Sequence, residues 1–458
     1  MSQAVAAGLD GRAQVSALFR WSALFMMSFV VLGVYYAYDA LNPIGGMLVR
    51  ELGISEAEFG VLKQTAVSIP NVLILIVGGI IIDRIGARLG GGIFAFACLL
   101  GTLLTAVGGQ MESYWVMFFG RILFGSGVES LLIAQNKIIT KWFAGKELSL
   151  AFAINLAICR FGTLFAFMSV NGMANSMGWQ NTLWAIAGLM AVCFATFIVY
   201  TFMDRHMERK VSVQEEKSDQ IDFKQVFGLP ASFWFITALC VTFYCAVFPF
   251  LDFATQVFEA RFGMSEAYGS TVAGAVIMLT IVFTPFFGWL CDRIGRRATM
   301  MIIGASLIVP IHLAIGFLGG GTPAARPAEP FLDIVVFQWY AVFPFNGTDA
   351  IPILPVMCLG IAFSLVPAAM WPSVARMVDQ KRLGTAYGIM FLIQNIGLMG
   401  MSPMVGWGKL PFQASAFGPF QVSMMLLAGL GLIGAIFAVL LKIADRKAAV
   451  SIEVPEGR

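Results

Sequence analysis

The sequence has 458 residues, of which 59% are hydrophobic and only 12% are charged. Its mean hydropathy is +0.83, and an ordinary soluble domain has about 25% charged residues. A soluble enzyme and a disordered chain are therefore excluded, because so much apolar surface has to be covered by a membrane. The net charge of +3 is too small to indicate a nucleic-acid-binding protein.

Long apolar runs predict an all-α integral membrane protein with twelve transmembrane helices, since one bilayer span needs about 20 apolar residues. The charged stretch 204–230 predicts a solvated linker between an N-terminal six-helix bundle (1–203) and a C-terminal six-helix bundle (231–458). The predicted spans are 20–48, 57–82, 89–109, 112–137, 148–173, 181–203, 231–259, 268–291, 298–319, 351–376, 384–408 and 419–441.

The chain offers few groups for redox or metal chemistry. Its seven cysteines lie inside apolar runs without a CxxC pair, which predicts buried thiols and neither disulfides nor metal ligands. His206 and His312 are isolated, so we expect no metal and no cofactor. The first apolar run is too long for a cleaved signal peptide.

Basic residues predict the orientation. If the N-terminus is cytoplasmic, the tails, the linker and the even-to-odd loops hold 22 of the 29 Lys and Arg residues. Three more fall within spans, at Lys63, Arg121 and Arg160, and Lys63 is expected to reach outward from its span. Only four are left for the other side. The positive-inside rule therefore predicts that both termini are cytoplasmic.

The two halves repeat in sequence. Leu52–Ala57 matches Phe262–Ala267 at an offset of 210, and Asp83–Arg88 matches Asp292–Arg297 at an offset of 209. Beyond Lys146 the offset rises to 235, which predicts an extra outer loop at 320–350. Such repeats are typical of membrane transporters that bind their substrate near the bilayer midplane.

The sequence Asp83-Arg-Ile-Gly-Ala-Arg88, repeated after the eighth span, resembles the inner-loop signature of the major facilitator superfamily. Gly120-Arg121 followed by Gly125 and Gly127 resembles its second signature. The resemblance implies the major facilitator fold, with two pseudo-symmetric six-helix bundles around a central cavity. It also implies a carrier that works by alternating access.

A closer resemblance covers nearly the whole chain. Other segments resemble the branch of major facilitator superfamily domain-containing protein 1, which includes the animal lysosomal exporter of dipeptides. This implies a dipeptide site, with the ligand's amino group near Glu129 and its carboxylate near Arg160. The matching segments are Ser68–Asn71, Glu129–Asn136, Trp142–Leu148, Ala246–Phe250, Trp371-Pro372, Leu383–Gly388 and Gln394–Gly397.

The chain departs from that branch in its 320–350 loop and in lacking an acidic dileucine signal near its N-terminus. We therefore favour a bacterial inner membrane over a lysosomal one. A monomer is the default expectation, because each half can bury its own helices.

Glu129 and Arg160 form the sharpest candidate site. They lie 15 residues before and 16 residues after position 144, so a rise of about 1.5 Å per residue puts them at similar depth near the midplane. A charge at the bilayer centre costs about 2.5–3.5 kcal/mol. A carboxylate and a guanidinium suit the two ends of a dipeptide zwitterion. The alternative is a structural ion pair between two helices.

Other charged residues are predicted to serve coupling or gating. Arg121 either faces the same cavity as Glu129 or hydrogen-bonds the backbone of a neighbouring helix. Asp39 and Asp252 are predicted near an outer gate, where Asp39 could carry a proton; alternatively, both are hydrated carboxylates in a vestibule.

Neutral and inner-face residues complete the predicted site. The candidate pocket walls are Tyr38, Tyr244, Trp371, Gln394 and Asn395, although each could instead serve packing. The inner clusters either cross-link spans in the outward-open state or simply anchor the loops by positive charge. Their members are Asp83, Arg84, Arg88, Asp292, Arg293, Arg296 and Arg297.

Three other functions compete with dipeptide transport. An organic-anion, monocarboxylate or drug carrier would bind a lone carboxylate at Arg160 and use Glu129 for a proton. A membrane-embedded enzyme would need an intramembrane histidine or a Ser/His pair, and only His312 falls within a span. A nutrient receptor would bind ligand without moving it.

Overall fold

The computed structural model describes residues 15–143, 148–210, 229–318, 350–378, 383–408, 418–446 and 451–454. Every regular element in these ranges is helical, which confirms the predicted all-α class. The elements are α2 (Ala17–Asp39), the 3₁₀ turn η1 (Asn42–Ile44), α3 (Gly45–Leu52), α4 (Glu56–Gly60), the π-helical turn η2 (Val61–Thr65), α5 (Ala66–Gln110), α6 (Tyr114–Phe143), α7 (Leu148–Met177), α8 (Trp179–Glu208), α9 (Ala231–Phe262), α10 (Glu266–Ile294), α11 (Arg297–Phe317), α13 (Ala350–Met377), α14 (Leu383–Trp407) and α15 (Gln421–Asp445).

Eleven helical segments of the described chain are long and apolar enough to cross a membrane. The predicted 57–82 span is not among them; it runs through α4, η2 and the start of α5. The predicted 320–350 loop falls almost wholly outside the described residues, as does most of the 204–230 linker.

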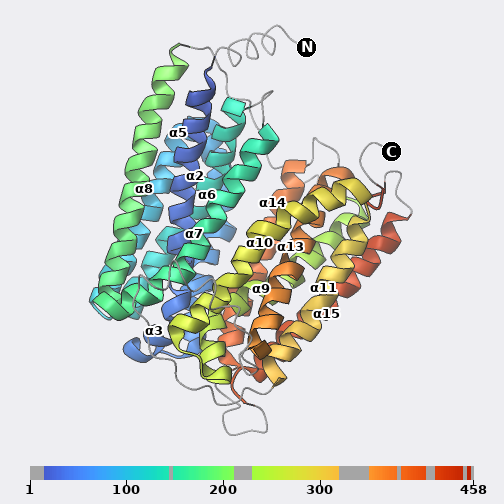
Figure 1. Cartoon of the computed structure of the whole chain (residues 1–458). Coiled ribbons are helices and arrows are strands. Elements are labelled where there is room, and N and C mark those ends of the chain that lie inside the picture. The colour runs from blue at the N-terminus through green and yellow to red at the C-terminus, as the bar shows by residue number, and fades with distance from the viewer. Residues whose placement is uncertain are drawn as a thin grey trace. The chain divides into compact units, whose positions relative to one another are not determined.

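By packing, the chain forms two compact units. Unit 1 comprises Met1–Tyr38, Ile69–Thr163 and Gln180–Asp219, and unit 2 comprises Asp39–Ser68, Leu164–Trp179 and Gln220–Arg458. Helices α2, α6 and α8 run side by side in unit 1, and α9, α10, α11, α13, α14 and α15 pack together in unit 2 (Figure 1). The predicted division at 204–230 concerns the sequence repeat; it is not tested by these units and stays a prediction.

The first repeated motif folds the same way in both copies. Gly53 (φ 62°) and Gly263 (φ 60°) end their helices in the left-handed region, where glycine carries no side-chain penalty. Two residues later, Ser55 and Ser265 cap the next helix by accepting a backbone N–H bond. The repeat in sequence is thus also a repeat in local structure.

The second repeated motif breaks a helix at its glycine in both copies. Gly86 (φ 84°) kinks α5, and Gly295 (φ 68°) follows the end of α10. The spans predicted at 57–82 and 89–109 are therefore two helical segments of α5 that are separated at Gly86.

The predicted first span, 20–48, is wrong as a single helix. Helix α2 ends at Asp39, and the chain turns through η1 before α3 begins at Gly45. The reason is Pro43, which stands at the start of η1. Proline lacks an N–H group, and it disfavours the helical conformation of the residue before it.

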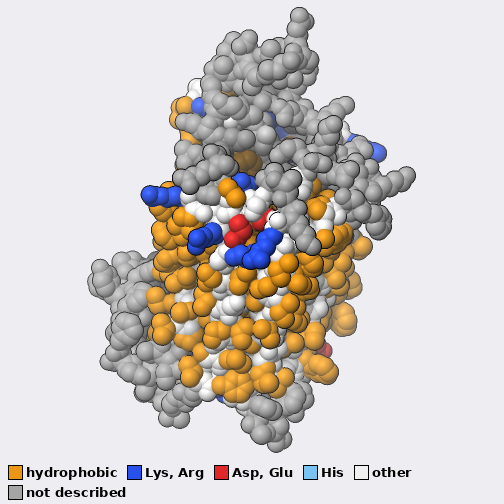
Figure 2. All heavy atoms as spheres, turned by 90° about the vertical axis from the view of Figure 1, so that its right-hand side faces the viewer, with side chains coloured by type: hydrophobic (Ala, Val, Ile, Leu, Met, Phe, Trp, Pro, Cys, Tyr) orange, Lys and Arg blue, Asp and Glu red, His pale blue; other side chains and the backbone are white. Residues whose placement is uncertain are grey.

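Apolar side chains remain exposed where lipid would cover them. On α15, Leu432, Ile436, Val439 and Ile443 form a stripe at helical spacing and are all exposed. Figure 2 shows a broad hydrophobic area on one face, with charged side chains gathered at one border of it. All seven cysteines are free and six are buried, as predicted.

Candidate functional site

Glu129 lies on α6 and Arg160 on α7, and both belong to unit 1. Both side chains are half-buried. The Arg160 guanidinium carbon lies 5.8 Å from the ring centroid of Tyr35 on α2. Within the described part of the chain, no ion pair joins Glu129 to Arg160 and neither makes a hydrogen bond. The structural ion pair between Glu129 and Arg160, which was the alternative interpretation of these residues, is therefore not formed.

A buried amide network braces the helices that carry these two charges. The Asn155 side chain on α7 accepts hydrogen bonds from Ser28 on α2 (2.8 Å) and from Gln135 on α6 (2.7 Å). Gln135 also donates to a backbone carbonyl of α2. Sequence reasoning missed this network. The available signal was the presence of polar residues, Ser28, Gln135 and Asn155, within three apolar helices. The network fixes α6 and α7 within two turns of Glu129 and Arg160.

Arg121 on α6 makes the helix-to-backbone bonds that were one of its two predicted roles. Its two terminal nitrogens donate to the carbonyls of Ala37 and Tyr38, each at 3.1 Å. These carbonyls are in the last turn of α2, where a helix has no partners of its own for them. The guanidinium also lies 5.1 Å from the Phe124 ring centroid. Tyr38 thus contacts Arg121 through its carbonyl and also through its ring, whose centroid lies 5.8 Å from the guanidinium carbon.

Asp39 and Asp252 lie in unit 2 and share one cation. Lys63 Nζ is 3.4 Å from Asp39 Oδ1 and 3.2 Å from Asp252 Oδ1. The Lys63 side chain is completely buried, so the expectation that it reaches outward is wrong. The carboxylates are 14% and 4% exposed, and the alternative of two hydrated carboxylates therefore does not hold.

Aromatic side chains from three helices of unit 2 gather around Trp371 on α13. The Trp371 indole nitrogen donates to the Tyr244 hydroxyl on α9 at 3.1 Å. Its ring stacks on Phe391 of α14 at 4.8 Å, and the Tyr387 hydroxyl donates to its carbonyl. The predicted residues Trp371 and Tyr244 are thus brought together. Sequence analysis did not predict the other two members of this cluster, Tyr387 and Phe391.

The two predicted amides are adjacent on α14. The Gln394 side-chain oxygen accepts a bond from the Cys240 thiol of α9. The Asn395 amide donates to the Phe391 carbonyl one turn earlier. Both side chains are less than 10% exposed.

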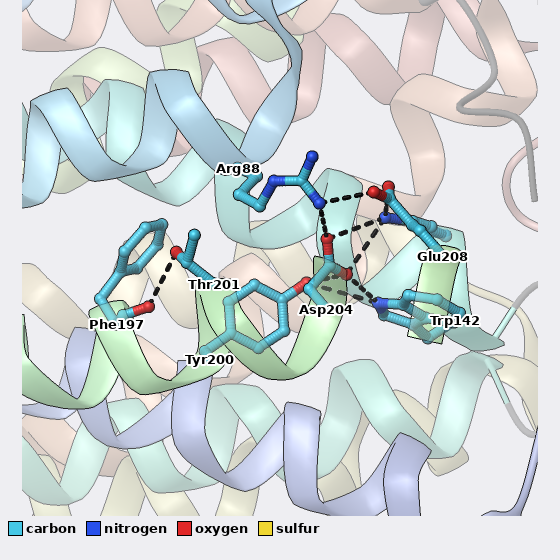
Figure 3. Close-up of polar contacts among 8 residues, drawn as sticks. Arg88, Trp142, Phe197, Tyr200, Thr201, Asp204 and Glu208 are labelled. Atoms are coloured by element: carbon cyan, nitrogen blue, oxygen red, sulfur yellow. Dashed lines mark hydrogen bonds and ion pairs between the residues drawn. The ribbon is translucent and has the colours of Figure 1, made fainter. Parts of the chain in front are cut away.

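The first copy of the inner-face motif, Asp83–Arg88, contributes Arg88 to a charged cluster that sequence analysis missed (Figure 3). Asp204 of α8 accepts hydrogen bonds from Arg88 of α5 (2.9 Å), from Lys141 of α6 (3.1 Å) and from the Trp142 indole (3.0 Å). The Tyr200 hydroxyl donates to the same carboxylate. Three helices of unit 1 are thereby joined at one buried acid.

Glu208 extends this cluster by one turn of α8. It pairs with both Arg88 and Lys141. The available signal was the i, i+4 spacing of Tyr200, Asp204 and Glu208, which puts them on one helix face. Arg84 is exposed, and the Asp83 side chain lies outside the described set.

The second inner-face motif is held within unit 2. The Asp292 carboxylate pairs with Arg297 at 2.9 Å. Arg293 lies over the exposed Trp289 ring, and the Arg296 backbone N–H donates to the Glu453 carbonyl. This motif therefore bonds to the C-terminal segment, whereas Arg88 of the first copy bonds to α8.

The model of the Major Facilitator Superfamily matches residues 25–399. The chain belongs to this superfamily. It is a membrane transporter, not an enzyme. A bacterial homolog of the human lysosomal transporter Spinster, solved in an inward-facing and unoccupied conformation, has the same fold: its TM-score is 0.72 at 14% identity, over 94% of this chain and 99% of that one.

Curated relatives add a narrower similarity. The chain is 31% identical over 409 residues to the lysosomal dipeptide transporter MFSD1 of Homo sapiens, covering 84% of this chain and 79% of that protein. It is 30% identical over 402 residues to the Danio rerio protein of the same name, covering 85% and 80%.

Proposed function

We propose that this superfamily member moves small peptides, chiefly dipeptides, by alternating access. The similarity to lysosomal dipeptide transporters carries the proposal, because it is 30–31% identity over more than four-fifths of the chain. Glu129 and Arg160 support it. Each lies half-buried in an apolar helix of unit 1, and the two do not neutralise each other.

The chemistry of a dipeptide fits two separate charges. Its ammonium group would pair with the Glu129 carboxylate, and its carboxylate would accept a bidentate bond from Arg160. Such a site binds both ends of the ligand and makes looser contacts with its side chains. A tripeptide would be rejected, because the spacing between the two ends is then wrong.

A second candidate is an organic-anion carrier. A 19% identity to the Escherichia coli "Probable galactarate/D-glucarate transporter GarP", over 84% of this chain, favours it. In such a carrier Arg160 would bind a lone carboxylate, and Glu129 would carry a proton.

The setting belongs to the same proposal. We place the carrier in a bacterial inner membrane as a monomer with both termini cytoplasmic. The basic-residue asymmetry supports this orientation.

The test is a thermal-shift screen of the purified protein against dipeptides, tripeptides, free amino acids and monocarboxylates. A ligand at 100 times its dissociation constant stabilises by about 2.7 kcal/mol. Dipeptides alone should raise the melting temperature of the wild type. Arg160→Ala and Glu129→Gln should each abolish that shift.

Arg160→Lys is the matched control, because it keeps the charge but loses the planar fork. It should retain a weakened dipeptide response. A shift produced by monocarboxylates and kept in Glu129→Gln would reject the dipeptide site and favour the organic-anion carrier. Equal shifts by tripeptides and dipeptides would contradict the fixed spacing.

A further inference from the structure

Lys63 occupies an unusual backbone position. It lies in the π-helical turn Val61–Thr65, between α4 and α5. A π turn inserts one extra residue, which rotates the preceding residues by about 100° relative to the helix that follows. Such turns are rare and occur often at functional sites. Here the turn carries a lysine whose side chain is fully buried.

The partners of Lys63 come from segments far apart in the sequence. Asp39 ends α2, and Asp252 lies on α9. Ser402 on α14 donates to the second oxygen of Asp252 at 2.8 Å. Asn42 donates to Asp39 at 3.4 Å. We call Asp39, Lys63, Asp252 and Ser402 the charge latch.

The segments joined by the charge latch are packed at backbone distance. A Cβ atom at Gly60 would lie 2.8 Å from the Pro403 backbone, and one at Gly406 would lie 2.4 Å from the Glu56 carbonyl. The Thr65 hydroxyl donates to the Met399 carbonyl at 2.6 Å. Residues 56–65 therefore fit tightly against α14, and both lie in unit 2.

A second set of charges joins α3 to α9 and α10. Arg50 pairs with Glu259 and Glu266, and its own side chain is 56% exposed. Water competes for the exposed Arg50 guanidinium in both pairs, so each pair contributes little, even though Glu266 is only 12% exposed. Lys63 differs because its side chain is fully buried, and its removal would take away the cation that the carboxylates of Asp39 and Asp252 share.

We propose that Lys63 is the central cation of a latch whose release controls the separation of residues 39–68 from α9 and α14. This rests on the proposed alternating-access cycle, because one end of such a carrier has to open. Asp39 and the π turn belong to the first sequence half, whereas Asp252 and Ser402 belong to the second. Opening at this end requires Lys63 to leave Asp252.

The test is hydrogen–deuterium exchange of the full-length protein in lipid nanodiscs, without substrate. In Lys63→Gln, exchange in residues 56–66 and 250–262 should accelerate about tenfold or more, because local opening no longer breaks an ion pair. Arg50→Gln is the matched control at the exposed pair, where acceleration should stay below about twofold. Equal acceleration in both variants, or none in Lys63→Gln, would overturn the latch.

Lys63→Gln could fail to fold, since it leaves two buried carboxylates together. The double variant Lys63→Gln/Asp252→Asn removes one of them and keeps a partner for Ser402. It should also exchange faster than wild type, and wild-type exchange would reject the latch. Because no substrate is present, this result is independent of the dipeptide assignment. If dipeptides do not shift the melting temperature of the wild type but Lys63→Gln still exchanges faster, only the proposed substrate is rejected.

Discussion

Asp204 is the residue on which three helices of unit 1 depend. It is 1% exposed, and Arg88, Lys141, Trp142 and Tyr200 all donate to it. In Asp204→Asn the two cations would keep only Glu208 as a charged partner in this cluster. Breaking a buried ion pair costs about 3–5 kcal/mol. The apparent melting temperature in detergent should therefore fall by about 10 °C.

Arg205→Gln is the control for that experiment. It changes a charge at the next position of α8, where the side chain is exposed. Its melting temperature should stay within about 2 °C of the wild type, because exposed charges contribute about 0–1 kcal/mol. If both variants melt alike, Asp204 does not hold these helices together.

The sequence predicted which charged residues are important, but it did not predict the residues that they contact. The rarity of charge in apolar helices singled out Glu129, Arg160 and Arg121, and the structure gives Arg121 one of its two predicted roles. An outward Lys63 is the natural expectation from sequence, because a long charged side chain usually finds water. The sequence cannot show that a π turn aims it at two carboxylates from distant segments.

At the scale of elements, glycines set how closely α5 and α6 approach. A Cβ atom at Gly101 would lie 2.2 Å from the Phe124 backbone nitrogen, and one at Gly120 would lie 2.6 Å from that of Thr105. Small residues let membrane helices pack at backbone distance. Gly101→Ala should destabilise unit 1 by about 1–3 kcal/mol, since backbone atoms have to move. Thermal unfolding in detergent measures this.

Gly188 on α8 provides the matched substitution. A Cβ atom at this position would have no heavy atom within 4 Å among its described neighbours. Gly188→Ala should leave stability unchanged or raise it by about 0.5–1 kcal/mol, because alanine favours the helix. A Gly101→Ala protein as stable as Gly188→Ala would mean that α5 and α6 can separate without cost.

Helix ends followed local chemistry and were therefore largely predictable. Predicted spans such as 112–137 and 298–319 overlap α6 and α11 closely, because polar residues end the apolar runs. One failure is at the first predicted span, where an apolar run hides a change in backbone. Pro43 divides that span. By contrast, the predicted boundary between the spans 57–82 and 89–109 coincides with the non-helical residue Gly86.

At the scale of the molecule, the sequence repeat specifies the local turns but not the partners of the charged side chains in them. The glycines of both inner-face motifs have positive φ, at Gly86 and Gly295. Yet Arg88 reaches acids on α8, whereas Asp292 pairs with Arg297 in its own motif. Repeated residues keep their backbone roles because these depend on a few neighbours. Their side-chain partners differ between the two copies, because Arg88 pairs with a distant helix and Asp292 pairs within its own motif.

The orientation of the whole chain is the remaining prediction, and the charge distribution supports it. The turn between α5 and α6 has no basic residue, whereas α6 ends with Lys137 and Lys141. Positive charge resists transfer across the membrane. A fluorescent protein fused after Arg446 should fold in the cytoplasm and fluoresce, and alkaline phosphatase there should be inactive. Fusions after Gln110 should give the opposite pair of results. Reversed activities at both sites would put the termini outside and the charge latch at the cytoplasmic end.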